Sequence, residues 1–477
     1  MTPSACDLLV TGGCVLTVDD DRSVLDPGAV AITGDRITAV GPADDFAGWR
    51  AARVIDARRR AVIPGLVDCH NHLFQALARG LGEGLSIWPW LCEFMWPYSI
   101  AMTPEDARVA ATLGAIEAVR AGTTAVIDNH YAPTDAATTL AVADAIEGVG
   151  LRGALARGIV GAKTEVAARR ALPDALFRYH PDEEIEITRA CMVERPPGST
   201  VSVWPAPLNL AYVDQDLVRR AVALARELGS HWHTHCSEGQ KDPASYLEAY
   251  GIRPVEWLHR EGLLDERATL AHAIWIDDRE VRLIGEAGAG TAHNPTSNAY
   301  LASGHMRLRE LRDAGGVVGL GTDGPSCGHR QDLFECMKQT MSIQRLHALD
   351  PSVVRCEEVL ELATREGARL AGIDAGVLAA GKLADLVVVR LDRPHLQPLH
   401  RAVAAVVYSA APGDVEYTVC GGRVAFENGR CTLVDEDAAI EAAQDRAAGL
   451  VDRAGFGPLC SPWSRGPAPE GHGTRPD

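Results

Sequence analysis

Lysine, long apolar runs and regularly spaced cysteines are all scarce in this chain of 477 residues. No stretch reaches the about 18 consecutive apolar residues of a membrane-spanning helix, so we expect no transmembrane segment. The 12 cysteines include no C-x-x-C pair and no regular framework, which in a long chain without a signal peptide indicates reduced thiols. Lysine occurs only at positions 163, 241, 338 and 382.

Basic residues are also fewer than acidic ones: 46 Lys and Arg against 64 Asp and Glu give a formal net charge of −18. Nucleic acids and anionic membranes favour basic surfaces, so we expect neither as a partner. The N-terminal stretch MTPSACDLLVTGGCVLTVDD has no basic region followed by an apolar one. We therefore expect a cytoplasmic protein.

The order of β-type and helical patterns predicts an α/β fold. Short β-type runs between residues 7 and 63 are separated by Gly, Asp and Pro and predict a small antiparallel unit. After Pro64, apolar strands alternate with helical stretches in about eight units, which favours a closed (β/α)8 TIM barrel. Beyond Gly381, β-type runs return at 382–391, 402–410 and 415–430, and we expect them to pair with the N-terminal strands.

This pattern divides the chain into three predicted parts. Residues 1–63 and 371–434 together form a β-sandwich domain, and residues 64–370 form the barrel. Residues 435–477 form a helix followed by a loosely ordered tail rich in Pro and Gly.

Polar residues that end apolar runs mark the candidate site, because barrel active sites lie at the carboxyl ends of the strands. His70 and His72, in VIPGLVDCHNH, are alternate residues of one strand and project to the same side. Three other runs end in His235 (HWHTHCSE), His272 (ATLAHA) and Asp323 (GLGTDG). Imidazoles with a carboxylate suit zinc or iron and leave a position open for water. Taken singly, the histidines also fit hydrogen-bonded core positions, and GTDG fits a simple turn.

Five motifs in this order resemble the amidohydrolase superfamily, in its branch of mononuclear-metal aminohydrolases that includes cytosine, guanine and S-adenosylhomocysteine deaminases. The motifs are VIPGLVDCHNH, HTHCSE, AHNPTSNAYLASG, GLGTDG and GKLADLVVV, and the resemblance covers nearly the whole chain. It implies a hydrolase that releases ammonia from a planar nitrogen heterocycle: a purine, pterin, pyrimidine or triazine-like base.

The resemblance also implies a role for each site residue. The metal ligands are His70, His72, His235 and Asp323. Glu238 matches the glutamate that shuttles protons, His272 orients the attacking water, and Asp323 accepts a proton from it. His233 lies on the same strand face as His235, but the family ligand is the second histidine, so we interpret His233 as structural.

The scarcity of lysine bears on the number of metal ions. Binuclear relatives bridge two metals with a carboxylated lysine between the H-x-H pair and the third histidine. The only lysine in that interval is Lys163, beyond the third strand, and the expected fourth strand TVSVWPAPL has none. We predict one divalent transition metal per chain, zinc, with iron as the alternative.

Four residues are candidates for substrate binding. Gln75 and His130 lie in segments that look like 8-oxoguanine deaminase and the s-triazine hydrolases. Trp90 belongs to IWPWLCEFMWP, residues 87–97, which we call the aromatic segment and expect over the pocket as a loop or short helix. Arg157 ends the third strand and is a candidate to bind a carbonyl or carboxylate. The alternatives are that Gln75 is a surface glutamine, that the aromatic residues are packing anchors and that Arg157 forms a structural salt bridge.

Two departures from the family pattern concern the substrate. Nucleoside-handling members carry a glutamate that holds ribose hydroxyls where this chain has Ser99. The segment after Asp323 reads PSCGHRQD, residues 325–332, in place of the usual Ser-Asn-Asn/Asp segment. Both favour a free base over a standard nucleoside.

Alternative functions stay open at this point. A hydrolase of the same fold displaces chloride or an alkylamine, or opens a cyclic amide, and a metal-binding scaffold has no turnover at all. Glu238 favours deamination, because an amine leaves only once it is protonated. We also expect a homodimer or higher homo-oligomer.

Overall fold

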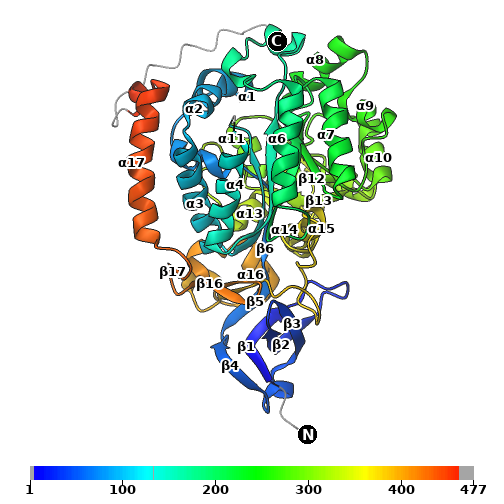
Figure 1. Ribbon diagram of the computed structural model, residues 1–477. Helices are drawn as coiled ribbons and strands as arrows, with labels where there is room; N and C mark the ends of the chain where they lie inside the picture. Colours follow the sequence, from blue (N-terminus) through cyan, green and yellow to red (C-terminus); the bar gives the residue numbers. More distant parts are fainter. Residues whose placement is uncertain (1–4, 133, 461–477) are drawn as a thin grey trace.

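Along the chain, β-rich segments precede and follow a central stretch in which strands and helices alternate, and these outer strands lie together at one end of the molecule (Figure 1). The structure is a computed structural model that describes residues 5–132 and 134–460. The expected order of patterns, β-rich, then alternating, then β-rich, is confirmed in these residues.

The terminal segments build one nine-stranded sheet in the order β17-β16-β15-β14-β5-β1-β2-β3, with β4 also beside β1. Its strands are β1 (Ala5–Leu16), β2 (Val24–Thr33), β3 (Arg36–Pro42), β4 (Arg50–Asp56), β5 (Arg60–Pro64), β14 (Leu386–Arg390), β15 (Val415–Cys420), β16 (Arg423–Glu427) and β17 (Arg430–Cys431). The antiparallel pairing of β5 with β14 joins the two ends of the chain, as the sequence predicted.

The prediction of a purely antiparallel N-terminal unit is wrong. β4 and β5 both run parallel to β1. β1 is long enough for its first half to pair with β4 and its second half with β5, along one edge. The chain therefore passes from β4 to β5 without reversing its direction.

Eight parallel strands form the centre of the molecule. They are β6 (Leu66–Asn71), β7 (Thr123–His130), β8 (Arg152–Ile159), β9 (Val201–Pro207), β10 (Trp232–Cys236), β11 (Ala268–His272), β12 (Gly290–His293) and β13 (Val317–Leu320). Hydrogen bonds connect them as two four-stranded sheets, β6-β7-β8-β9 and β10-β11-β12-β13. Single parallel bridges, Asn71 with Asp323 and Asn209 with His235, link the two sheets at their edges. Nearly every residue of these strands is buried, which is typical of parallel sheets covered on both faces.

Helices follow most of the central strands. They are α3 (Pro104–Arg120), α4 (Ala136–Val149), α5 (Glu165–Arg169), α6 (Pro181–Glu194), α7 (Gln215–Glu227), α8 (Lys241–Tyr250), α9 (Pro254–Arg260), α10 (Asp278–Ala287), α11 (Pro295–Tyr300), α12 (Leu308–Asp313), α13 (Leu333–Ala348), α14 (Cys356–Ala363) and α15 (Arg365–Leu370). None of the helices in the described ranges combines the length and apolarity needed to cross a membrane.

The aromatic segment is helical, within the prediction of a loop or short helix. It comprises α1 (Ile87–Pro89) and the π-helical η3 (Trp90–Met95), and it continues into α2 (Trp96–Ala101). Residues 402–410, in contrast, were predicted as a strand, and this prediction is wrong. They contain α16 (Ala402–Tyr408), which packs against α13 and α14.

The C-terminal helix, α17 (Glu436–Ala454), runs alongside α3 (Figure 1). The buried carboxylate of Asp106 in α3 accepts a hydrogen bond from Arg446 Nε of α17 at 2.7 Å, and it also pairs with Arg453. The prediction of a helix after residue 434 is confirmed. Of the predicted loose tail, residues 457–477, the first four form the short 3-10 helix η7 (Gly457–Cys460), and residues 461–477 lie outside the described residues.

Candidate active site

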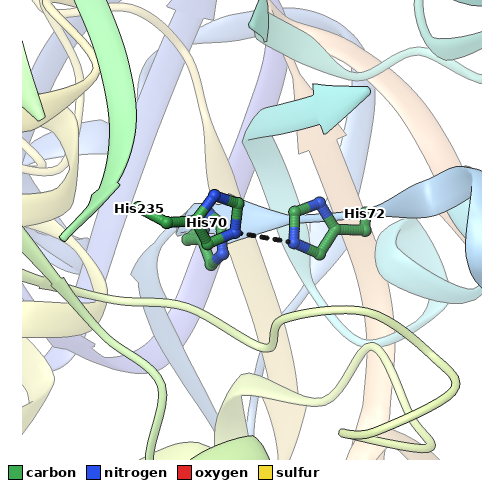
Figure 2. A group of neighbouring side chains, drawn as sticks. All are labelled: His70, His72 and His235. Atoms are coloured by element: carbon green, nitrogen blue, oxygen red, sulfur yellow. Dashed lines mark hydrogen bonds between the residues drawn. The ribbon is translucent and has the colours of Figure 1, made fainter. Parts of the chain in front are cut away.

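Histidines from two different sheets meet at the carboxyl ends of their strands. His70 lies at the end of β6, His72 directly follows this strand and His235 lies in β10, and the ring of His72 faces the other two rings (Figure 2). One nitrogen from each of these three side chains lies within 4.8 Å of the others. The group of His70, His272 and Asp323 meets the same limit, so the structure brings all five predicted side chains together.

Backbone carbonyls fix the tautomers of two of these histidines. His72 Nδ1 lies 2.6 Å from the carbonyl oxygen of Asn129, and His235 Nδ1 lies 2.7 Å from that of Leu208. A carbonyl only accepts, so each Nδ1 carries the proton and each Nε2 presents a lone pair. The two Nε2 atoms are 3.3 Å apart, joined by the dashed line in Figure 2. Two lone pairs at this distance repel each other unless a cation lies between them.

The donor set is completed by Asp323, which has a left-handed backbone conformation with φ of 59°. Its Oδ1 lies 3.2 Å from His72 Nε2 and 3.6 Å from His70 Nε2, which has no hydrogen-bond partner within the described residues. A backbone hydrogen bond from Asp323 to the carbonyl of His70, 3.0 Å long, fixes their separation. Three imidazole nitrogens and a carboxylate oxygen match the preferred ligands of a divalent transition metal.

His233 supports this set. Its Nε2 lies 3.0 Å from His70 Nδ1, and the two rings stack with centroids 4.9 Å apart. A hydrogen bond to Nδ1 orients the ring of His70 and leaves its Nε2 directed toward Asp323.

His272 and Glu238 form an acid–base pair beside the donor set. His272 Nε2 lies 3.6 Å from Glu238 Oε2 and 3.7 Å from Asp323 Oδ2. Burial raises the pKa of Glu238 to about 7, where His272 opposes the shift and Asp323 adds to it. Burial would lower the pKa of His272, but the two carboxylates outweigh it and the pKa is raised. Glu238 is therefore poised to take up and release a proton near neutral pH.

The turn that carries Glu238 is held by backbone hydrogen bonds. Ser237 has a φ of 50°, and its carbonyl accepts from the backbone N–H groups of Ile274, at 3.2 Å, and Trp275, at 2.9 Å. These residues lie two and three positions after His272. The same loop therefore fixes both members of the acid–base pair.

A small cavity adjoins these groups. It is lined by the predicted Gln75 and Trp90, and by Tyr131, Asn209, Tyr212 and Cys327, which the sequence analysis did not select. Tyr131 and Asn209 follow the ends of β7 and β9, so the strand-end criterion that identified the histidines also applies to them.

Gln75 lies in η2 (Leu73–Ala78), and its amide is bonded to protein groups on both sides. Its Nε2 donates to the hydroxyl of Tyr131 at 2.6 Å, and its Oε1 accepts from Ser326. A Cβ at Gly324 would lie 1.8 Å from Gln75 Oε1, so a side chain there would displace it. The segment 325–332, which departs from the family pattern, thus reaches the cavity directly through Cys327 and also through the bond from Ser326 to Gln75.

His130 and Arg157 do not line the cavity, which corrects their expected position at the substrate. His130 is buried with its ring 4.9 Å from that of Phe74. Arg157 is buried, and its guanidinium pairs with Glu184 at 2.7 Å. Arg157 therefore forms the structural salt bridge that was the alternative.

Ser99, the position that favoured a free base, is also outside the cavity lining. It is buried in α2, and its hydroxyl donates to the carbonyl of Met95 at 2.8 Å. Within the described residues, the only carboxylates that line the cavity are Glu238 and Asp323.

Comparison with known proteins agrees with this site. The model of the Amidohydrolase family matches residues 61–425, and the chain belongs to this family. It is 36% identical to a 5-methylthioadenosine/S-adenosylhomocysteine deaminase of Haloarcula marismortui over 450 residues, 94% of this chain and 99% of that protein. It is 32% identical to a 5'-deoxyadenosine deaminase of Methanothermobacter thermautotrophicus over 447 residues, 93% of this chain and 99% of that protein.

Solved structures give the same result. An adenosine deaminase from Xanthomonas campestris with bound zinc has 28% identity and a TM-score of 0.85, over 94% of this chain and 100% of that one. A variant of atrazine chlorohydrolase from Arthrobacter aurescens with zinc and atraton has 25% identity and a TM-score of 0.86, over 92% of this chain and 100% of that one. The resemblance is confirmed, and with it an α/β fold of the TIM-barrel type. The chain is a hydrolase that uses a divalent metal and a small-molecule substrate.

The contacts of Arg157 predict a role in stability. Replacing it with methionine leaves the buried Glu184 without its cation, so Arg157→Met should lower the free energy of unfolding by about 3–5 kcal/mol while the KM stays unchanged. Chemical denaturation and steady-state kinetics measure the two quantities. Arg189→Met, which breaks an exposed pair with Glu227, is the control and should cost at most about 1 kcal/mol. A raised KM at unchanged stability would restore Arg157 as a substrate ligand.

Proposed function

We propose that this protein is a hydrolytic deaminase that releases ammonia from the amino group of a planar nitrogen heterocycle. One observation carries the proposal: Glu238, His272 and Asp323 face one another beside the three converging imidazoles. The names of the relatives, which are deaminases of adenosine derivatives, add support and suggest an aminopurine.

The proposed metal ligands are His70, His72, His235 and Asp323. The facing lone pairs of His72 and His235 and the free Nε2 of His70 fit a divalent cation. When bound there, such a metal lowers the pKa of water toward about 7 and supplies hydroxide at neutral pH. We propose one zinc ion per chain, with iron as the alternative. Lys163 forms an exposed ion pair with Asp174 at 2.6 Å, which supports a single metal.

In the proposed reaction, protein groups move protons while water attacks the carbon that bears the amino group. Asp323 takes a proton from the water, which His272 orients, and Glu238 delivers a proton to the adjacent ring nitrogen. The proton held by Asp323 then passes to the amino group, and the carbon–nitrogen bond breaks. Ammonia leaves, the hydroxyl proton of the intermediate returns to Glu238, and the carbon keeps the oxygen as a carbonyl. Trp90 is the proposed stacking partner of the ring, and Gln75 with Tyr131 binds its edge.

A second candidate is a hydrolase that displaces chloride or an alkylamine. The similarity to atrazine chlorohydrolase favours it. The two candidates differ in the product released, so a panel of aminated and chlorinated heterocycles assayed for ammonia and chloride separates them. Glu238 favours deamination, since chloride leaves without a proton.

We further propose that the eight parallel strands close into one barrel within residues 64–370. Residues 1–63 and 371–434 would form the β-sandwich domain, and residues 435–477 a C-terminal part. Support comes from the bridges between the two four-stranded sheets and from the pairing of β5 with β14.

The assembly and location of the chain belong to the proposal as well. Leu346 and Leu349 are largely exposed and offer apolar surface for a homodimer or higher homo-oligomer. All 12 cysteines are free thiols, which supports a cytoplasmic location.

The donor set predicts one tightly bound divalent metal per chain. Elemental analysis of purified protein should find about one equivalent of zinc or iron, and His235→Ala should lose it, because a missing imidazole breaks the set. His259→Ala, a histidine of α9 outside the site, is the matched control and should keep the metal. Two equivalents per chain would contradict the mononuclear assignment.

Glu238 is predicted to handle protons without binding the metal. Glu238→Gln keeps the shape but loses the exchangeable proton, so ammonia release should fall by about 100-fold or more while the metal content stays the same. Glu248→Gln, at an exposed position of α8, should behave like the parent enzyme. The assigned role fails if Glu238→Gln loses the metal or retains near-normal turnover.

The cavity lining predicts a preference for a base over its nucleoside. Only Glu238 and Asp323 offer carboxylates within the described lining, and both are needed for the reaction, so two ribose hydroxyls would lack a charged partner. Each hydroxyl left unpaired costs about 1–3 kcal/mol, which lowers kcat/KM for adenosine relative to adenine by about 100-fold or more. Equal or faster turnover of adenosine would align the enzyme with its named relatives instead.

A further inference from the structure

A buried carboxylate outside the acid–base pair joins two parts of the site that are far apart in sequence. Asp242 Oδ2 accepts from the backbone N–H of Gly239, next to Glu238, at 2.8 Å. Its Oδ1 accepts from the indole N–H of Trp88, in the aromatic segment, at 3.0 Å. We propose that Asp242 is a positioning residue that couples the aromatic segment over the cavity to the placement of Glu238.

The chemistry of the groups fixes the donor and the acceptor of these two hydrogen bonds. A backbone N–H and an indole N–H only donate, and each needs its own acceptor. The two oxygens of a carboxylate supply both acceptors, whereas an amide of the same shape supplies one. Asp242 is 3% exposed, so water cannot replace a lost bond without entering the protein.

Gly239, next to Glu238, also packs closely against the aromatic segment. A Cβ at this position would lie 3.2 Å from Ile87 Cγ2 and 3.3 Å from Asp242 Oδ1. Ile87 precedes Trp88 and itself lines the cavity. The turn of Glu238 therefore rests directly on the aromatic segment, and a shift of either part is felt by the other.

Helix α8 anchors Trp88 by a second route. The guanidinium of Arg170 lies over the Trp88 ring, 4.2 Å from its centroid, and donates to the hydroxyl of Ser245 at 2.6 Å. Asp242 and Ser245 both belong to α8, and Asp242 is in its first turn, where the helix dipole favours a negative charge. Trp88 is thus held at its edge by Asp242 of α8 and over its face by Arg170, which Ser245 of α8 binds in turn.

Burying the Asp242 carboxylate costs desolvation energy, and its two hydrogen bonds offset this cost. Desolvation raises the pKa of Asp242, while the Gly239 and Trp88 hydrogen bonds and the nearby Arg170 oppose the shift. The structure retains a buried acid here, although an apolar side chain would avoid the desolvation. The two hydrogen bonds that only a carboxylate can accept explain its presence.

The test rests on the proposed function and uses whichever of adenine and adenosine the metal-loaded parent enzyme deaminates. Asp242→Asn leaves one N–H facing an NH2 group, so kcat should fall about 10–100-fold and KM should rise. Trp88→Phe keeps the ring but removes its N–H, so KM should rise about 3–10-fold with kcat nearly unchanged. Both substitutions remove the hydrogen bond between Trp88 and Asp242, so the kcat and KM of the double variant should match those of Asp242→Asn alone.

Trp257→Phe is the control, because this buried indole N–H in α9 has no hydrogen-bond partner within the described residues. It should leave kcat and KM unchanged, and all variants should keep the metal. Additive effects, or parent-like kinetics in Asp242→Asn, would overturn the proposal. If Asp242→Asn does not fold, an unchanged KM in Trp88→Phe overturns it. An inactive parent enzyme would instead count against the proposed function.

Discussion

The site depends on two backbone carbonyls that accept hydrogen bonds from histidine rings. The carbonyls of Asn129 and Leu208 hold the Nδ1 protons of His72 and His235, and this alone directs both Nε2 lone pairs into one small space. With the other tautomers, an N–H would point at the cation position. Asn129 lies in β7 and Leu208 directly follows β9, so the ligand geometry is a consequence of strand register as much as of side-chain identity.

The same register places an acid beside the histidines. The bridge between Asn71 and Asp323 and the hydrogen bond from Asp323 to the carbonyl of His70 connect the first and last of the central strands. Residues more than 250 positions apart are thereby fixed within hydrogen-bonding distance. The turn of Glu238 is fixed in the same way by the residues after His272. Each functional side chain thus lies within a rigid strand or up to three residues beyond its end, which limits its freedom of movement.

The sequence was sufficient for the parts of the site that lie on strands. Apolar runs that end in a polar residue identified His70, His272 and Asp323, because the carboxyl ends of parallel strands must meet. The same pattern did not predict which side chains beyond the strand ends line the cavity. His130 and Tyr131 are neighbours, yet the first packs on Phe74 and the second lines the cavity. A shift of one residue reverses the face of a side chain, and periodicity alone does not fix where the strand ends.

The fold, too, was predictable from the sequence only in part. The pairing of the terminal strands was predictable from their β-type runs, but residues 402–410 were not, because a short run of Val and Ala satisfies a strand and a buried helix equally well. Its contacts with α13 and α14 decide in favour of the helix. The parallel pairing of β4 and β5 with β1 was hidden for a similar reason, since strand direction depends on partners distant in sequence.

Burial gives the site its chemistry by acting on acids and bases in opposite senses. Desolvation lowers the pKa of His70 and His235 well below the usual range, so these rings stay neutral and bind a cation without competition from protons. The same desolvation raises the pKa of Glu238 to about 7, so this group can carry a proton at neutral pH. His272 is the exception, because two carboxylates face it and raise its pKa. One low-dielectric environment therefore yields neutral ligands and a proton carrier, and His272 differs from the other rings because Glu238 as well as Asp323 faces it.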